Sequence, residues 1–559
     1  MRGFHIFPEL SNSGSPPAQP GVYSGEIMAD TGISKEKVRD VQYPRELVLG
    51  ENLRRNALRF PNRLAVAFED RRFTYEEFNT RVNKLANALI DRGVKTGDKI
   101  ALFGHNSDTW VTAALGIAKA GGVIVPANFR LIGSEIEYII NHNDSVFLFI
   151  DHGLLATIKD VKSNLKVRDI IVMRGEAPAG MLDFEGVLES GSGEEPGVKV
   201  WEGDFSFHAQ TGGTTGKPKA VVHTHRSICS ISYQICFIHN YCEPDRGMMA
   251  LPAYSSAGVA YDWGATLFHG GSLFILRSTG FNPVEVLETI HREKINHLTL
   301  APVMLRAILL VPDEVRTKFD VSSVHSLLCI GAPTPQELRE AAVKYFGEVL
   351  YVEYSASEHG VSTLLRPEEV LQHPGSSGRA ALGQEVKVVD REGTELPRGE
   401  IGEIVAASVQ VSQGYYKNPE ANRDAFFGRF LGIGDMGYMD DEGYIYLVDR
   451  KSDMIISGGV NIYPAEIEAV MIEHPQIQEL AVIGVPDAKW GESVKAVVIK
   501  KEGATLTEQT IIEWCKGKIA GYRIPRSVDF VTDFPRTAAG KIQKKALREQ
   551  YWKESDRKI

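Results

Sequence analysis

Apolar and polar positions follow two periods along this chain, and the two periods alternate. Segment 74–93 reads TYEEFNTRVNKLANALIDRG, and its apolar residues recur at helical spacing: Phe78, Val82, Leu85 and Leu89. Thr74 and Glu77 have the spacing of a capping box, and Gly93 is a typical helix stop. This pattern predicts an amphipathic helix with one buried face.

Short apolar runs typical of buried strands stand on either side of further helical patterns. KIALFGHN (99–106) predicts a strand, SDTWVTAALGIAKAGG (107–122) a helix, and VIVPAN (123–128) the next strand. The same helix-then-strand order returns in 282–302 and 335–360, and no short repeat suggests a solenoid. We therefore expect an α/β protein whose large N-terminal domain has parallel-rich sheets covered by helices.

The pattern changes after about residue 385. Segment 386–408 consists of short strands separated by Gly and Pro turns, which predicts a β-rich subdomain. The tail from Lys451 onward has its own helix and strand alternation, enough for a small α+β domain. The charged segment DRKSD (449–453) is the expected boundary between the two domains.

Composition narrows the class of protein. A chain of 559 residues is too long for one core, and a net charge of −10 with no long basic run argues against a nucleic-acid partner. Five cysteines without CxxC spacing indicate reduced thiols. The first 45 residues are rich in Ser, Pro and Gly, which predicts a flexible leader, and Met28 is an alternative start. Without a signal sequence or an apolar span, we expect a cytoplasmic protein with no stable membrane anchor.

The segment TGGTTGKPK, from Thr211 to Lys219, is the strongest chemical signal. Glycines let successive backbone N–H groups point at one anion, and lysines add positive charge, so phosphate is the natural ligand. It is not a Walker loop, because Thr211 stands where that motif needs glycine and Pro218 follows Lys217. A plain hairpin loop between two strands is the alternative interpretation.

Five segments in order resemble motifs of the adenylate-forming superfamily, which includes acyl-CoA synthetases, luciferases and the adenylation domains of peptide synthetases. They are TGGTTGKPKAVVHTH (211–225), GAP (331–333), EYSASEHG (353–360), the stretch from GDMGY to AEIE (434–468), and PRTAAGKI (535–542). The resemblance covers the chain from about residue 46. It implies that a carboxylate attacks ATP to give an acyl-adenylate and pyrophosphate, and that CoA then takes the acyl group and releases AMP.

The resemblance also implies a domain arrangement. We expect a leader at 1–45, an ATP- and acyl-binding domain at 46–449, a hinge at 450–453, and a mobile lid domain at 454–559. Ser452 matches the hinge position about which the lid rotates between the two half-reactions.

For ATP, the resemblance assigns catalytic roles to Lys541, Glu358 and Thr214, with Mg²⁺ held by Thr214 and Glu358. Lys541 would bridge the substrate carboxylate and the α-phosphate, Tyr354 would stack on adenine, and Asp435 and Arg450 would contact the ribose. The whole expected nucleotide set is Thr211, Gly212, Gly213, Thr214, Thr215, Gly216, Lys217, Lys219, Gly331, Ala332, Pro333, Glu353, Tyr354, Ser355, Ala356, Ser357, Glu358, Asp435, Arg450 and Lys541.

For CoA and the acyl group the resemblance gives two further sets. The residues expected to contact CoA are Gly458, Gly459, Trp490, Tyr522 and Arg526. The residues expected to line the acyl pocket are Tyr254, Ser255, Gly258, Tyr261, Gly331, Ala356, His359 and Gly360. Ser255 stands where many relatives have His and where amino-acid-activating relatives often have Asp, which disfavours an amino-acid substrate. Small residues walled by aromatic ones favour a medium-sized apolar acid: aromatic, alicyclic or medium-chain.

Two alternatives stay open at this stage. One is an adenylating enzyme that loads the thiol of a separate carrier protein. The other is a catalytically inactive nucleotide-binding homologue, which the joint presence of Glu358, Asp435 and Lys541 disfavours. A homodimer is one possible assembly.

Overall fold

The structure is a computed structural model that describes residues 47–211, 218–458, 460–487, 489–536 and 542–552. The chain divides into two units, Met1–Pro44 and Arg45–Ile559, and everything below concerns the second. The predicted leader lies outside the described residues. Among the helices described, none has both the length and the apolar character needed to cross a membrane.

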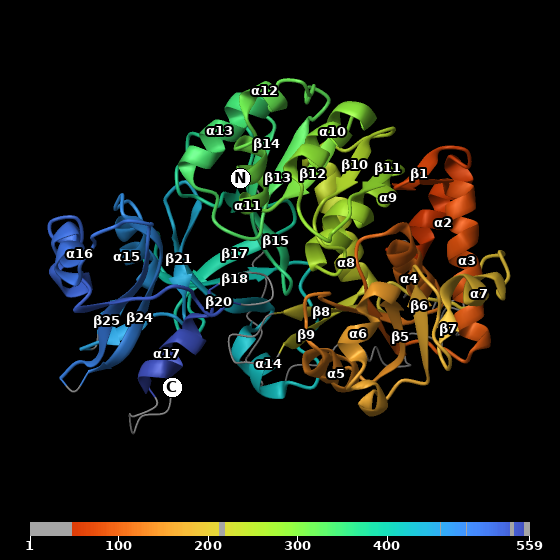
Figure 1. The fold of residues 1–559 in the computed structure, drawn as a ribbon, viewed down its shortest axis with the longest axis horizontal. Coiled ribbons are helices and arrows are strands. Elements are labelled where there is room, and N and C mark those ends of the chain that lie inside the picture. Colours follow the sequence, from red (N-terminus) through yellow and green to blue (C-terminus); the bar gives the residue numbers. More distant parts are fainter. Residues whose placement is uncertain (1–46, 212–217, 459, 488, 537–541, 553–559) are drawn as a thin grey trace, which may run out of the picture. The chain divides into compact units, whose positions relative to one another are not determined.

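A seven-stranded sheet carries the predicted β-α-β unit (Figure 1). Its strands in spatial order are β7 (Leu182–Asp183), β6 (Asp169–Met173), β5 (Ser145–Asp151), β3 (Lys99–Phe103), β4 (Val123–Ala127), β8 (Phe205–Thr211) and β9 (Lys219–Thr224). The predicted strands β3 and β4 pair in parallel, and α4 (Asp108–Lys119) connects them. The sheet's other helices are α5 (Gly133–His142), α6 (Leu155–Ile158) and α7 (Phe184–Glu189).

Helix α3 (Tyr75–Asp91) confirms the first predicted helix and its cap. The Thr74 backbone N–H donates to Glu77 Oε2 at 2.8 Å, and the Glu77 backbone N–H donates to Thr74 Oγ1 at 3.3 Å. The four apolar residues at helical spacing are fully buried. Gly93, at φ +81°, lies just past the helix end in the left-handed conformation that glycine adopts without strain. Helix α2 (Leu49–Arg59) packs against α3 and α4.

The largest sheet in the described residues has nine strands. Its order is β16 (Arg379–Ala380), β15 (Gly360–Leu365), β14 (Leu350–Ala356), β13 (Ser326–Cys329), β12 (His297–Leu300), β10 (Arg246–Met249), β11 (Ser272–Ile275), β1 (Leu64–Phe68) and β2 (Arg71–Thr74). Strands β14, β13, β12, β10, β11 and β1 run parallel to one another. The helices between β9 and β14 in the chain are α8 (His225–Ile238), α9 (Ala265–His269), α10 (Pro283–Glu293), α11 (Pro302–Leu309), α12 (Asp313–Arg316) and α13 (Gln336–Phe346). The predicted pairs α10–β12 and α13–β14 are confirmed.

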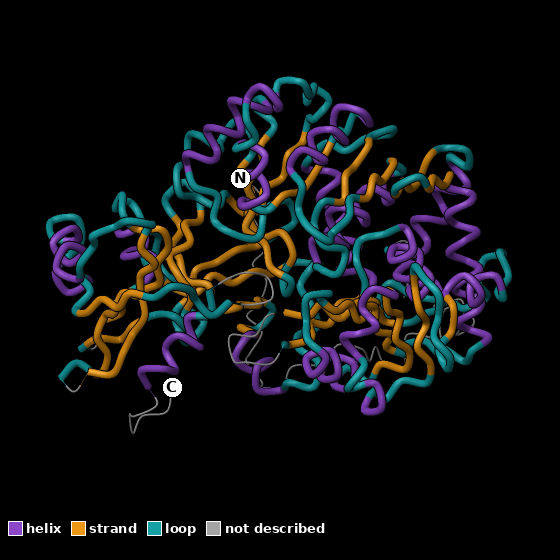
Figure 2. Tube along the Cα trace, viewed as in Figure 1, coloured by secondary structure: helices purple, strands orange, loops and turns teal. Residues whose placement is uncertain are grey.

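The β-rich segment and the tail form two smaller sheets, drawn as strands in Figure 2. The first comprises β17 (Glu385–Val389), β18 (Gly402–Ala407), β20 (Phe430–Met439), β19 (Phe426–Phe427) and β21 (Ile445–Arg450), with α14 (Pro419–Ala425) beside β20. The second comprises β23 (Val460–Ile462), β22 (Ile455–Ser457), β25 (Gly491–Lys500), β24 (Ile477–Asp487) and β26 (Ser527–Phe530), with α15 (Pro464–Met471), α16 (Glu508–Cys515) and α17 (Lys544–Trp552). The second has core clusters of its own, built from residues between Ile455 and Leu547. The exact limits of the predicted domains stay a prediction.

Candidate active site

Three of the predicted site segments lie where parallel strands of the nine-stranded sheet end. Strand β10 leads into the segment 252–258, β13 leads into 331–333, and β14 leads into the turn before β15. Carboxyl ends of parallel strands meet at one edge of a sheet, which is where open α/β sheets bind their ligands. Gly331, Ala332 and Pro333 are exposed at this edge.

The turn between β14 and β15 is held from two sides. Gly360 has φ +67°, and a Cβ added there would lie 2.3 Å from Gln410 Oε1, so only glycine fits. The Ser357 carbonyl accepts a hydrogen bond from His223 Nε2 at 2.7 Å. Burial lowers the pKa of His223 to about 4, so a neutral imidazole makes this bond. Ser355, Ala356 and Ser357 are half-buried along the turn.

Asp435 and Arg450 lie directly opposite each other on β20 and β21. Arg450 Nε is 3.1 Å from Asp435 Oδ1, and the Tyr354 hydroxyl donates to Asp435 Oδ2 at 2.9 Å. Burial, reinforced by the neighbouring Asp435, raises the pKa of Tyr354 well above its usual value, so the phenol stays a donor. The structure thus brings together the three residues expected at adenine and ribose. The Tyr354 ring is buried, 5.5 Å from the His359 ring.

Glu358 is the second buried carboxylate of the site. Its Oε1 accepts a hydrogen bond from the Tyr415 hydroxyl at 3.1 Å, and its backbone carbonyl accepts one from Ser412 N at 2.8 Å. Burial raises the pKa of Glu358, while Arg450 acts in the opposite direction. Both Arg450 and Asp435 influence the pKa of Glu358, so this carboxyl lies within electrostatic reach of the predicted ribose pair.

Tyr415 is a functional candidate that the sequence interpretation missed. Its loop lies along β9: Val222 N donates to the Gly414 carbonyl at 2.9 Å, and Tyr416 N donates to the Ala220 carbonyl at 2.8 Å. Lys219 Nζ lies 4.7 Å from the Tyr415 ring centroid. Tyr415 therefore connects the end of the predicted phosphate segment to Glu358. The glycine followed by two tyrosines in SQGYYKN was the available signal.

The predicted phosphate segment connects two antiparallel strands. Thr211 ends β8 and pairs with Lys219 at the start of β9. Both are half-buried. Residues 212–217, which include the expected Gly212, Gly213, Thr214, Thr215, Gly216 and Lys217, lie outside the described residues, as does the expected catalytic Lys541. Both the phosphate-binding loop and the plain hairpin loop proposed for this segment require such a pair of strands.

The segment expected to line the acyl pocket begins an unusual helix. The Ser255 hydroxyl donates to the Pro252 carbonyl at 2.8 Å and accepts from Gly258 N at 2.9 Å, so it caps the helix. A Cβ at Gly258 would lie 2.4 Å from the Pro252 oxygen. Residues Gly258–Gly264 then form a π-helix, a local distortion found frequently at functional sites. Ser256 Oγ donates to Ser357 Oγ at 3.0 Å, which joins this segment to the β14–β15 turn.

Aromatic side chains flank this segment on one side. The half-buried Tyr254 ring lies 5.6 Å from the Phe129 ring, which in turn lies 4.5 Å from the His105 ring. Sequence interpretation missed Phe129 and His105. Tyr261 is buried on the π-helix, whereas the Asp262 carboxylate accepts from Leu251 N at 3.2 Å, inside the protein. Burial raises the pKa of Asp262 well above its usual value.

Two expected residues have fully buried side chains with protein partners of their own. Glu353 Oε1 lies 3.1 Å from His239 Nε2, and both side chains are completely buried. Neighbouring residues on a strand point to opposite faces, so the structure does not bring the Glu353 carboxylate together with Tyr354 and Asp435. His359 Nδ1 lies 2.8 Å from the Ser362 hydroxyl.

Three of the residues expected to contact CoA meet in the C-terminal sheet. Gly458 N donates to the Trp490 carbonyl at 2.8 Å, and a Cβ at Gly458 would lie 2.6 Å from the Trp490 ring. The Arg526 guanidinium lies 5.2 Å from the centre of that ring. Tyr522 is 48% exposed and its hydroxyl accepts from Arg523 Nε at 3.2 Å. Gly459 lies outside the described residues.

The expected hinge residue has few constraints on its side chain. Ser452 is exposed, and its carbonyl accepts from Arg548 Nη1 at 2.8 Å. Its neighbour Asp453 lies within reach of Lys544 and Arg548, although burial raises the pKa of that carboxyl overall.

Comparisons with known proteins place this geometry in context. Residues 53–416 match the family described as AMP-binding enzyme, and residues 466–541 match the AMP-binding enzyme C-terminal domain. The long-chain-fatty-acid–CoA ligase FadD13 of Mycobacterium tuberculosis is 35% identical, with 86% of this chain and 94% of that protein covered. A feruloyl-CoA synthase of Amycolatopsis is 32% identical, with 89% and 98% covered. The crystal structure of the anthranilate CoA ligase AuaEII with anthranoyl-AMP superposes with a TM-score of 0.80 at 29% identity, covering 90% of this chain and 97% of that one.

Proposed function

The chain belongs to the family of AMP-binding enzymes, within the adenylate-forming superfamily, and we propose that it is an AMP-forming acyl-CoA synthetase. In the first half-reaction a carboxylate oxygen attacks the α-phosphorus of ATP and pyrophosphate leaves. In the second, the CoA thiol attacks the acyl carbon and AMP leaves. One observation carries the proposal: Glu358, which follows β14, interacts with Asp435 and Arg450 of β20 and β21, and each of the three has a protein partner.

These residues suit a nucleotide whose two ends need different partners. A carboxylate with two acceptor oxygens suits the ribose hydroxyls, and Asp435 is already oriented by Tyr354 and Arg450. The loop from Thr211 to Lys219 supplies backbone N–H groups and lysines for the phosphates.

Mg²⁺ fits the donor set at Glu358. Carboxylate oxygen is a preferred ligand for this cation, and a carboxylate keeps acceptor capacity after one hydrogen bond, here from Tyr415. Together with the Thr214 hydroxyl it would hold a cation that offsets phosphate charge. A neighbouring cation also favours the ionised form of a carboxyl whose pKa burial raises.

The second half-reaction calls for a rotation of the C-terminal domain. In our proposal Lys541 serves adenylation, and after rotation about Ser452 the residues Gly458, Gly459 and Trp490 face the thiol. Arg526 and Tyr522 suit the nucleotide end of CoA, because a guanidinium pairs with phosphate and an aromatic ring stacks on adenine.

For the acyl group we propose a medium-sized apolar acid. Ser255 uses its hydroxyl to cap a helix and carries no charge for a substrate ammonium. The named relatives act on a fatty acid, ferulate and anthranilate, all of which combine a carboxylate with an apolar body. We further propose that the enzyme acts in the cytoplasm and assembles as a homodimer.

A panel of carboxylic acids tests the proposal. Fatty, aromatic and alicyclic acids are each incubated with ATP and Mg²⁺, and pyrophosphate release is measured with and without CoA. We expect acid-dependent pyrophosphate release, and AMP and acyl-CoA in equal amounts once CoA is added. Pyrophosphate and an adenylate that CoA never consumes would favour the carrier-protein alternative. No acid-dependent release with any acid would favour the inactive homologue.

A further inference from the structure

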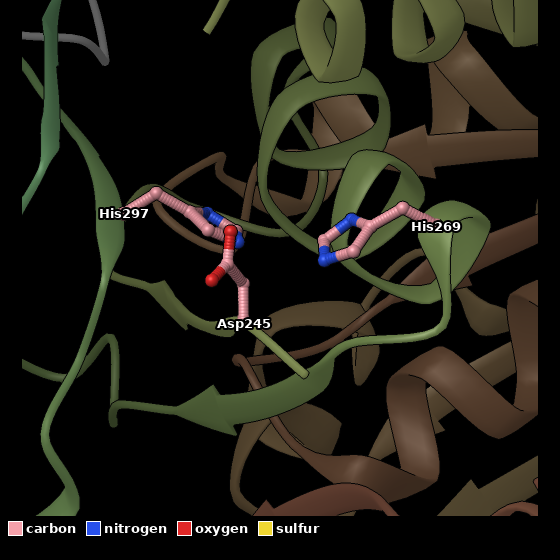
Figure 3. A group of neighbouring side chains, drawn as sticks. All are labelled: Asp245, His269 and His297. Carbon is pink, nitrogen blue, oxygen red and sulfur yellow. The ribbon is translucent and has the colours of Figure 1, made fainter. Parts of the chain in front are cut away.

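Two histidines and an aspartate meet at the amino-terminal edge of the nine-stranded sheet. The candidate active site lies at the opposite, carboxyl edge. Asp245 precedes β10, His297 begins β12, and His269 ends α9. One potential ligand atom from each lies within 4.8 Å of the others. Figure 3 shows both imidazole rings turned toward the Asp245 carboxylate. Asp245 and His297 are buried, and His269 is half-buried.

The hydrogen bonds of this cluster leave the Nε2 lone pair of His269 unused. His269 Nδ1 lies 2.8 Å from the Ala265 carbonyl, which can only accept, so Nδ1 carries the proton and Nε2 has a lone pair. Within the part of the chain that the structure describes, the buried Nε2 atoms of His269 and His297 have no hydrogen-bond partner. A histidine that donates through one ring nitrogen to a backbone carbonyl is the usual arrangement of a metal ligand.

Two glycines make room for the rings. A Cβ on Gly247 would lie 2.4 Å from His297 Cε1 and 2.2 Å from Thr266 Oγ1. A Cβ on Gly271 would lie 2.5 Å from His269 Nε2 and 2.6 Å from the Asp245 carbonyl oxygen. The Nε2 atom of His269 therefore lies on the Asp245 side of its ring. Any larger residue at either glycine would displace the imidazoles.

The donor types of the three side chains suit a cation. Cys242 N donates to Asp245 Oδ2 at 2.8 Å, and His325 Nε2 lies 3.2 Å from the same oxygen. The cluster thus presents one carboxyl group and two imidazole Nε2 atoms that have no hydrogen-bond partner among the described residues.

We propose that Asp245, His269 and His297 bind one divalent transition-metal ion, with Zn²⁺ as the best match. Two imidazoles and a carboxylate are ligands that Zn²⁺ accepts, at bond lengths of about 2.0–2.2 Å. Tetrahedral geometry then places ligand atoms about 3.4 Å apart, which small side-chain rotations achieve from separations within 4.8 Å. A water completes the coordination beside the buried Thr266 hydroxyl, another group without a partner among the described residues.

The position of this site assigns it a structural role. The ion joins the start of β10, the start of β12 and the end of α9, all at the amino-terminal edge of the parallel sheet. The substrates of the proposed reaction bind at the carboxyl edge. Metal binding therefore raises the thermal unfolding temperature by several degrees, because a ligand that binds only the folded state stabilises it, and leaves the rate of adenylation unchanged.

Cobalt provides a direct test, because Co²⁺ replaces Zn²⁺ and its visible spectrum reports coordination geometry. Full-length protein without an affinity tag is stripped with a chelator and titrated with Co²⁺. We expect the visible absorption of a four-coordinate ion, saturating at one equivalent and abolished by one equivalent of Zn²⁺. A spectrum identical to that of hexaaquo Co²⁺, or no saturation, overturns the proposal.

Substitutions of the proposed ligands test where the ion binds. His269→Gln keeps a half-buried polar side chain and should weaken Co²⁺ binding by more than about 100-fold, since loss of even an outer-shell partner costs 10–100-fold. His297→Gln should do the same, and if it does not fold, His269→Gln and the wild-type titration still decide. His291→Gln, at an exposed histidine on α10, is the control. Equal loss in this control, or none in His269→Gln, contradicts the assignment.

Discussion

At the scale of single residues, two buried tyrosines orient the two carboxylates of the candidate site. Tyr354 donates to Asp435, and Tyr415 donates to Glu358. Burial and the neighbouring carboxylate raise the pKa of each phenol far above any working pH, so both remain donors. Removing one hydroxyl leaves a buried carboxylate with one fewer partner, which costs more than the hydrogen bond contributes on average.

The Tyr415→Phe variant tests this role. A hydrogen bond to a charged group contributes about 1.5–3 kcal/mol, so kcat/KM for ATP should fall by about 10- to 100-fold. Initial rates of pyrophosphate release measure the effect. Tyr416→Phe is the matched control, because its hydroxyl donates to Asp144 at the surface at 2.8 Å. Equal loss in both variants would show that Tyr415 acts through general stability alone.

The pH dependence of nucleotide binding reports on Glu358. Burial raises its pKa above the ordinary 4.5, and a cation is bound by the ionised form. Affinity for Mg²⁺-ATP should therefore fall as the pH decreases through this raised pKa. Calorimetric titrations across pH measure it. Glu358→Gln should bind more weakly and lose this acid-side decline; a decline that persists in the variant belongs to another group.

At the scale of elements, the sequence predicted the regular parts and missed those set by long-range contacts. Helix α3 was predictable because its cap and apolar stripe are local. The π-helix at Gly258–Gly264 was not, since the Ser255 cap and the close approach of Gly258 to Pro252 appear only in three dimensions. Tyr415 was missed for the same reason: its loop reaches Glu358 only by lying along β9.

Motif matching likewise says little about which way a side chain faces. Tyr354 and Glu353 are neighbours in one motif, yet Tyr354 bonds to Asp435 whereas Glu353 pairs with the buried His239. The alternation of a β-strand explains the difference. The inward direction of Asp262 likewise depends on a contact with Leu251 N that no local spacing encodes.

The β14–β15 turn gives a prediction at this scale. Gly360→Ala combines a positive φ with a Cβ 2.3 Å from Gln410 Oε1, and should destabilise the protein by about 2–4 kcal/mol. Gly443→Ala, at φ +88° with open space around its Cβ, should cost only about 1–2 kcal/mol. Denaturant unfolding measures both. Equal values for the two variants would show that the contact with Gln410 relaxes freely.

At the scale of the whole molecule, the proposed mechanism uses charged residues from segments far apart in sequence. The described carboxylates lie in residues 350–450, and the cation that joins the two substrates is proposed to come from Lys541. A cation at that point offsets repulsion between the carboxylate and the α-phosphate during attack. The second half-reaction needs no such cation, because the attacking group is a thiol.

Lys541→Ala should therefore separate the two half-reactions. Acid-dependent pyrophosphate release should fall by at least about 100-fold, while transfer from supplied acyl-adenylate to CoA continues at a similar rate. Lys545→Ala, on helix α17, is the control and should leave both rates unchanged. Normal adenylation in Lys541→Ala would remove this lysine from the mechanism.

The most direct test of the account follows one oxygen atom. A carboxylic acid that the enzyme accepts is labelled with ¹⁸O in its carboxylate and converted with ATP and CoA, and the nucleotide product is analysed by mass spectrometry. Attack of the carboxylate on the α-phosphorus, followed by thiol attack on the acyl carbon, predicts AMP that carries one ¹⁸O atom. Unlabelled AMP, or ADP with the label in inorganic phosphate, would contradict it.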